Sequence, residues 1–334
     1  MERIGIVGAG RAGGALALAL AAAGWPVVAV ASRTPARAAW LAAALPGAAV
    51  VASAQAVADA ADLVVLTVPD AAIGPVAAGV AWRPGQAVVH TSGVESLGPL
   101  APARDAGALV GSLHPLQTFG PAPAADPRAP FVGITCALEG DAALLPRLEA
   151  IVAALGARSL RLPPEAKPLY HAAAVVASNY LVTLLHLAAG LWDVLGVDEQ
   201  TAIGALLPLV RGAVENVAAH GPGPALTGPI ARGDAATVAK HLAAIAAARP
   251  DSLPAYRALA RATLALAQAE GRVGREAAAA LCRVLADGAE DSATASGEPL
   301  PAPRAADEPP GALPREPDTP TTARPPARSE SPQE

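Results

Sequence analysis

The chain has 334 residues and a formal net charge of −5 at pH 7, which argues against a basic protein that binds nucleic acid. It has two cysteines, Cys136 and Cys282, so a disulfide framework is not expected. Its first residues lack the pattern of a signal peptide, and with the low cysteine content they predict a cytoplasmic protein. The histidines and cysteines do not have the spacing of a zinc site, and we expect no metal.

The first predicted element is a short apolar strand, Ile4–Val7, followed by a glycine-rich turn and an alanine-rich helix. The turn has the spacing GxGxxG, which at a strand-to-helix junction is typical of dinucleotide binding. The amide groups at the start of such a helix can bind the pyrophosphate. We therefore expect the cofactor to contact the whole turn: Gly8, Ala9, Gly10, Arg11, Ala12 and Gly13.

The second predicted strand, Val27–Ala31, ends in Ser32 and Arg33 rather than in a carboxylate. Sites for NAD usually carry an Asp or Glu at this place, which binds the ribose 2′-hydroxyl. An arginine can instead pair with the 2′-phosphate of NADP. The sequence therefore predicts NADP as the cofactor.

Further strands are predicted at Leu63–Val68, Ala87–His90, Ala108–Gly111 and Val132–Ala137, with helices between most of them. This alternation predicts an α/β fold with a doubly wound parallel sheet of the Rossmann type in residues 1–163. Ligands bind at the carboxyl ends of such strands. Two strand ends should therefore line the cofactor site, namely Thr67, Val68 and Pro69, and His90, Thr91 and Ser92.

After residue 163 the strand pattern stops, and an all-helical second domain is expected over residues 164–287. Its apolar stretch Ala172–Trp192 is long enough to span a bilayer, but the polar residues within it favour a buried helix and no membrane partner. The predicted helices are Pro168–Leu195, Glu199–Ala219, Ala235–Ala248, Leu253–Glu270 and Arg275–Leu285.

Residues 288–334 contain nine acidic and four basic residues and 11 of the 34 prolines. They have almost no large apolar side chains, so we expect a disordered acidic tail.

The first candidate group for chemistry lies on the helix predicted from Pro168. Lys167, at its start, is one of two lysines in the chain, and a partly desolvated lysine can lose its proton where arginine cannot. His171 and Ser178 are two helical turns apart and share a face, with Asn179 beside them. This helix is expected to face a substrate, and a core helix whose polar groups bond to neighbours is the alternative.

Two loops supply the other candidates. His114 follows a predicted strand and could donate a hydrogen bond or a proton to a substrate, or have a structural role. Thr227 and Arg232 lie in a glycine- and proline-rich loop, where Arg232 could pair with a substrate carboxylate or fix the loop. The proton donor is left open among Lys167, His171 and His114.

Four segments together carry a family resemblance: HTSG, SLHPLQTF, YHAAAVVASNYLVTLL and ALTGPIARGD. With them the chain resembles Rossmann-like proteins that have a DUF2520 C-terminal domain, which are related to the families of ketopantoate reductase, pyrroline-5-carboxylate reductase and prephenate dehydrogenase. The resemblance implies an NADP-dependent reductase with a small-molecule substrate and a homodimer formed with help from the helical domain. Ketopantoate reductases place an Asn one turn after the catalytic Lys, whereas this chain has His171 there.

The resemblance implies hydride transfer to a small carbonyl acid, and 2-dehydropantoate (ketopantoate) is the best single candidate. The alternatives are a reductase of an imine or of another 2-oxo acid, and an NADP-binding sensor module without turnover.

We predict that Arg33→Ala weakens binding of NADPH while leaving binding of NADH almost unchanged, because Arg33 faces the 2′-phosphate that NADH lacks. Fluorescence titration with both cofactors measures the two affinities. Equal losses for NADPH and NADH would contradict the assignment.

Overall fold

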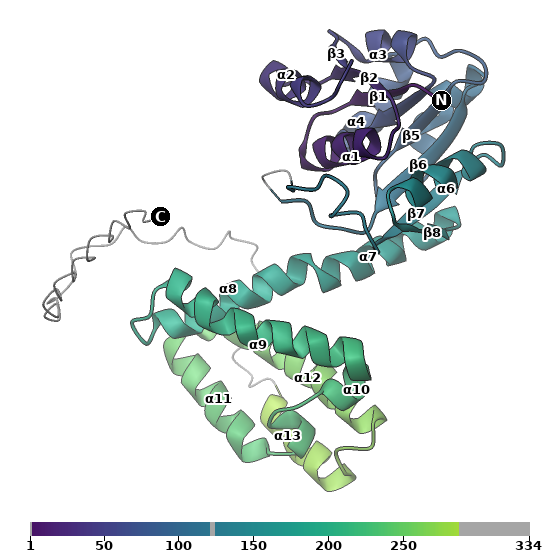
Figure 1. The fold of residues 1–334 in the computed structure, drawn as a ribbon. Helices are drawn as coiled ribbons and strands as arrows, with labels where there is room; N and C mark the ends of the chain where they lie inside the picture. Colours follow the sequence, from purple (N-terminus) through teal and green to yellow (C-terminus); the bar gives the residue numbers. More distant parts are fainter. Residues whose placement is uncertain (1, 121–123, 287–334) are drawn as a thin grey trace, which may run out of the picture. The chain divides into compact units, whose positions relative to one another are not determined.

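The computed structural model describes residues 2–120 and 124–286 (Figure 1). Its sheet has eight strands in the order β3-β2-β1-β4-β5-β6-β7-β8, and every neighbouring pair is parallel except β6 and β7. The doubly wound fold predicted from the sequence is thus confirmed, with one antiparallel step. The strands are β1 (Ile4–Val7), β2 (Val27–Ala31), β3 (Ala49–Val50), β4 (Leu63–Leu66), β5 (Ala87–His90), β6 (Leu109–Pro115), β7 (Thr135–Gly140) and β8 (Arg158–Arg161).

Alternate residues of each central strand enter two separate apolar cores, one on each face of the sheet. Ile4 and Ile6 of β1 belong to the first core and Val7 to the second, because successive side chains of a strand point to opposite faces. The first core is covered by α1 (Arg11–Ala22), α2 (Pro35–Ala43) and α6 (Leu145–Ala154). The second is covered by α3 (Ala54–Ala60), α4 (Asp70–Ala78) and α5 (Ala101–Asp105).

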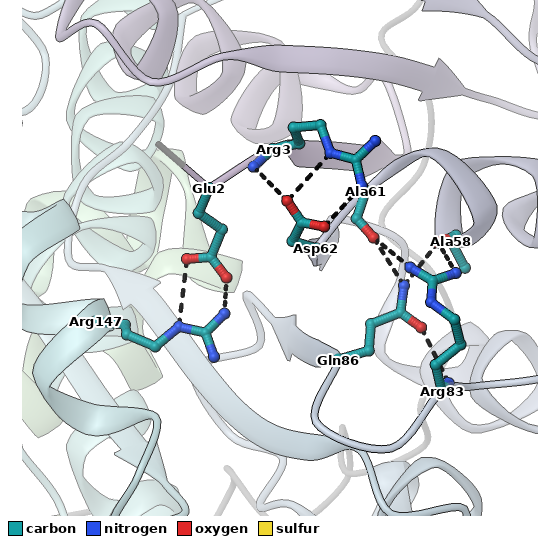
Figure 2. Close-up of polar contacts among 8 residues, drawn as sticks. All are labelled: Glu2, Arg3, Ala58, Ala61, Asp62, Arg83, Gln86 and Arg147. Atoms are coloured by element: carbon teal, nitrogen blue, oxygen red, sulfur yellow. Dashed lines mark hydrogen bonds and ion pairs between the residues drawn. The ribbon is translucent and has the colours of Figure 1, made fainter.

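Polar contacts tie the strands together at their amino ends (Figure 2). Arg3, just before β1, donates to the carboxylate of Asp62, just before β4, with a distance of 2.8 Å between Nη2 and Oδ1. These hydrogen bonds lower the pKa of Asp62 to about 2. The side chains of Arg83 and Gln86 donate to carbonyl oxygens at the end of α3. This edge is therefore occupied by structural bonds, and ligands are left to the opposite edge.

The long helix predicted from Pro168 is two helices, α7 (Lys167–Ala177) and α8 (Asn179–Asp193). Ser178 between them has φ −117° and ψ −67°, which interrupts regular helical geometry. The chain continues through α9 (Glu199–His220) and the short α10 (Pro222–Ala225). The last three helices agree with the prediction to within a residue: α11 (Ala235–Ala248), α12 (Leu253–Ala269) and α13 (Arg275–Leu285).

Contacts divide the described chain into two compact units. Among the described residues, one combines 2–226 with 240–256, and the other combines 227–239 with 257–286. The predicted domain boundaries, at 163/164 and 287/288, stay predictions, and the predicted disordered tail at 288–334 lies outside the described residues.

The expectation that the apolar helix after residue 163 is buried is wrong for the single chain. Pro164–Asp193 and Glu199–His220 are long and apolar enough to cross a membrane by length and composition alone, which is weak evidence for a membrane. Only 6% of each apolar window is buried by the part of the chain that the structure describes. Large exposed side chains here include Leu169, Val176, Val182, Leu195, Leu209 and Val214.

Candidate active site

Two of the three positions in the glycine turn after β1 can accommodate only glycine. Gly8 has φ +111°, and its carbonyl oxygen accepts a hydrogen bond from the Thr67 hydroxyl at 2.5 Å. A Cβ on Gly13 would overlap both the Gly8 oxygen and the Thr67 hydroxyl. A Cβ on Gly10, by contrast, would meet nothing within 4 Å. Gly8 and Gly13 are therefore required by packing, whereas Gly10 leaves open space where a ligand could approach the backbone.

The surroundings of the turn fit the phosphates of a dinucleotide. Helix α1 begins at Arg11, and Gly10 before it has no side chain to cap the helix, so the first amide groups can bind an anion. A cavity of about 630 Å³ lies against the turn, and its lining includes Gly10, Arg11, Arg37 and Trp40. Arg33, after the neighbouring strand β2, is exposed, as a contact with a 2′-phosphate requires.

Thr67 and His90 make internal bonds, and their contacts with a cofactor stay predictions. Thr67 holds the glycine turn, as described above. The His90 side chain is fully buried, its Nε2 lies 3.0 Å from the carbonyl oxygen of Ser96, and its Nδ1 accepts from the amide of Ser92. Burial lowers the pKa of His90 to about 4, so the ring is neutral at pH 7 with its proton on Nε2. This ring shapes the loop after β5.

The other residues predicted to line the strand ends fall into two groups, one with internal bonds and one that is accessible. The Ser92 hydroxyl accepts from the amides of Val94 and Glu95 and so also shapes the loop. Thr91 and Val68 are half-buried and Pro69 is exposed, which leaves them accessible.

Two of the three candidate proton donors, His114 and His171, lie together. His114 is near the end of β6 and His171 is in the second turn of α7, and their ring centroids are 5.9 Å apart. Tyr170 completes the group, with 2.9 Å between its hydroxyl and Nδ1 of His114. Both imidazoles pack on Gly93, where an added Cβ would lie 2.6 Å from Nδ1 of His171 and 2.9 Å from Nε2 of His114. We call these four residues the imidazole cluster.

The electrostatics of the imidazole cluster define which atoms carry protons. Burial, followed by the charges of His171 and Lys167, lowers the pKa of His114 to about 4, so this ring is neutral at pH 7. Burial raises the pKa of Tyr170 to about 12, so its hydroxyl keeps its proton and can donate to Nδ1 of His114. The proton of His114 is then on Nε2, which faces Gly93. Nδ1 of His171 is buried and has no hydrogen-bond partner within residues 2–120 and 124–286.

Lys167 lies one helical turn before the two aromatic residues, and its side chain is 2% exposed. Its ammonium donates to the hydroxyl of Ser112 at 2.9 Å and lies 3.3 Å from the carboxylate of Glu139. Burial lowers the pKa of Lys167, and the charge of Glu139 acts in the opposite direction. Ser112, Glu139 and Tyr170 were not predicted as site residues. Ser112 and Glu139 are buried polar residues on β6 and β7, and Tyr170 precedes His171 on α7.

The remaining predicted site residues are not part of the imidazole cluster. Ser178 is at the break between α7 and α8, and Asn179 is the exposed first residue of α8. Thr227 and Arg232 belong to the second compact unit, where Asp234 caps α11 by accepting from the amide of Thr237 at 2.9 Å. The roles of Ser178, Asn179, Thr227 and Arg232 in binding or catalysis stay predictions.

The strand order, the glycine turn and the polar residues at the carboxyl edge define the class of Rossmann-like nucleotide-binding proteins. The model of the Rossmann-like domain matches residues 2–115, and the model of DUF2520, a domain of unknown function, matches residues 134–263. The chain is thus a Rossmann-like, DUF2520-domain protein, as its sequence motifs predict.

Solved structures with the same fold include several oxidoreductases. A Bacteroides fragilis protein, provisionally described as an NADP oxidoreductase, is 27% identical, with 79% of this chain and 98% of that chain covered and a TM-score of 0.67. A Thermotoga maritima protein is 25% identical and has a TM-score of 0.61. The match covers 80% of this chain and 99% of that chain. An imine reductase from Pseudomonas sp. is 20% identical and has a TM-score of 0.57. The match covers 85% of this chain and 99% of that chain, and at this identity it shows the fold alone. No curated protein matches the sequence.

We predict that Gly93→Ala displaces the two imidazoles and lowers the free energy of unfolding by about 1–3 kcal/mol, the usual cost of overpacking. Chemical denaturation measures the stability, and the ring signals of His114 and His171 in NMR spectra report the displacement. The matched control is Gly98→Ala, because an added Cβ there would meet only the Ser96 hydroxyl at 3.8 Å. Unchanged stability and ring signals in Gly93→Ala would show that the rings do not pack on this glycine.

Proposed function

We propose that the chain is an NADP-dependent reductase that delivers a hydride to a small carbonyl acid or imine. The observation that carries this proposal is the imidazole cluster at the sheet edge that holds the glycine turn. It has a ring N–H and a ring nitrogen to which no described residue is hydrogen-bonded. The turn follows β1 and His114 is near the end of β6, three strand spacings away, or about 14 Å. The imidazole cluster would therefore lie within reach of a dinucleotide held at the turn.

The residues that would hold the cofactor follow from the geometry of the edge. The amides of Arg11, Ala12 and Gly13 bind the pyrophosphate, and Ser32 with Arg33 binds the 2′-phosphate. The accessible strand ends, at residues 68–69 and 91, contact the nicotinamide half. The bound cofactor supplies the hydride, which is the part of the reaction that the side chains of this protein cannot perform.

The imidazole cluster would supply the proton and orient the substrate. The Nε2–H of His114, which is neutral, donates a hydrogen bond to the carbonyl oxygen or imine nitrogen. His171, whose Nδ1 has no partner in the described chain, carries the mobile proton to the same atom as negative charge develops. Lys167 is the less favoured donor, because its ammonium is already held by Ser112 and Glu139.

The test is oxidation of NADPH by the purified full chain with a panel of acceptors, beginning with 2-dehydropantoate and followed by other 2-oxo acids and by 1-pyrroline-5-carboxylate as an imine. With whichever acceptor is reduced, we expect His171→Ala to lower turnover about 10²-fold or more, the usual scale for a lost acid–base group. Binding of NADPH, measured by fluorescence, should remain unchanged in that variant.

The matched control is His186→Ala, because His186 is exposed on α8 and pairs only with the exposed Glu199 among the described residues. It should retain full turnover. Full turnover in both His171→Ala and His114→Ala, with loss in Lys167→Arg, would make Lys167 the donor. Tight NADPH binding without reduction of any acceptor would favour the sensor module instead.

We also propose that the protein is a cytoplasmic homodimer formed through the exposed apolar faces of α8 and α9. Val182 is 68% exposed and Leu209 is 71% exposed, and exposed apolar side chains that gather on neighbouring helices often mark an interface. We expect light scattering to give about 66 kDa, twice the 32.9 kDa of one chain, and expect Val182→Arg to give a monomer. Gln200→Arg, at an exposed polar position on α9, is the control. A monomeric wild type, or its partition into lipid vesicles, would contradict the dimer.

A further inference from the structure

We propose that Lys167 is a positioning residue, which with Ser112 and Glu139 fixes the register of α7 on β6 and so brings Tyr170 and His171 to His114. This role of Lys167 rests on the proposed function, in which the imidazole cluster is the site of proton transfer. The contacts themselves, and the experiment below, do not depend on any reaction.

Two side-chain hydrogen bonds join α7 to β6. Ser112 and His114 are two residues apart on β6, so their side chains lie on the same face, about 6.7 Å apart along the strand. Lys167 and Tyr170 are three residues apart on α7, so they lie on one side of the helix, about 4.5 Å apart along its axis. Lys167 donates to Ser112 at 2.9 Å, and the Tyr170 hydroxyl lies 2.9 Å from His114. One bond fixes where the helix starts, and the second then places its next turn.

Glu139 makes the first of these bonds specific for a charged residue. It lies on β7 directly opposite Ser112 in the antiparallel β6–β7 pair, so one ammonium reaches both side chains. Glu139 is 8% exposed and Lys167 is 2% exposed, and neither charge can be left alone at such burial. A slip of α7 along the strand would separate the pair and leave both charges unpartnered, whereas apolar packing alone would tolerate a slip. Buried polar pairs of this kind are best known for setting register.

The position of Lys167 within α7 links this anchor to the imidazole cluster. Tyr170 and His171 follow it by three and four residues, which places them on the same side of the helix as Lys167, one turn further. Movement of the first turn therefore moves both rings relative to His114 and Gly93. Lys167 thus affects the cluster through α7 and does not need to touch the substrate.

The experiment uses NMR of the histidine rings in the full chain, which has six histidines. The Tyr170→Phe variant first shows which ring signals His114 gives when its hydrogen-bond partner, the Tyr170 hydroxyl, is removed. The test variant is Lys167→Met/Glu139→Gln, which removes both charges with little change in volume and leaves no charge unpaired. We expect it to fold, but to give His114 the signals seen in Tyr170→Phe and to raise its titration midpoint from about 4 to above about 5 as water reaches the ring.

Two further variants complete the test. Ser112→Ala removes one bond without changing any charge, so it separates loss of register from loss of a nearby positive charge, and we expect it to shift the same signals in the same direction. Lys240→Met, at the exposed second lysine, should give wild-type spectra. If Lys167→Met/Glu139→Gln does not fold, the His114 signals of Ser112→Ala alone test the proposal.

Wild-type His114 signals in folded Lys167→Met/Glu139→Gln or in Ser112→Ala would overturn the proposal. Because no substrate is used, this result is distinct from failure of the proposed reaction. A wild type that reduces no acceptor, yet shows the expected His114 signals and their loss in the variants, would overturn the reaction and retain the role of Lys167.

Discussion

Parallel pairing places the carboxyl ends of β1, β2, β4, β5 and β6 at one edge of the sheet, and the chemistry of the protein depends on that alignment. Both faces of these strands are occupied by apolar cores, and the amino edge is closed by ion pairs and side-chain bonds to backbone carbonyls (Figure 2). The loops at the carboxyl edge are therefore where polar groups can remain accessible. The glycine turn and the imidazole cluster lie at this edge for the same reason.

The antiparallel direction of β7 gives the sheet a side-chain pairing that a wholly parallel sheet would not have. It brings Glu139 opposite Ser112 and thereby creates a buried acidic position within reach of the helix that follows the sheet. Removing one partner of a buried ion pair typically costs about 3–5 kcal/mol, so such a pair resists rearrangement strongly. The Rossmann-like model matches Ser112, and the DUF2520 model matches both Glu139 and Lys167. The two matched segments therefore share a polar, directional contact in addition to their common apolar core and the continuous sheet.

The elements that sequence reasoning located best are those buried on both faces. β1, β2 and β5 are unbroken apolar runs with turn residues after them, and their observed limits equal the predicted ones. β8 was missed because Arg158–Arg161 is exposed throughout and has no apolar pattern, and β3 was missed because it has only two residues. The break at Ser178 has no Pro or Gly to signal it. In the site, the glycine turn could be predicted because its residues are contiguous. The pairing of His114 with Tyr170 and His171 joins positions more than fifty residues apart, which no local pattern encodes.

The continuity of the sheet across the two matched segments has a consequence for how such proteins can change during evolution. A fragment that ended at residue 115, where the first match stops, would leave the outer edge of β6 without its partner β7. That edge would present a row of free backbone N–H and C=O groups along seven residues, a template for intermolecular strand pairing and aggregation. The two segments are therefore poorly suited to independent shuffling between genes. A new helical partner for this nucleotide-binding half would have to bring its own edge strand with it.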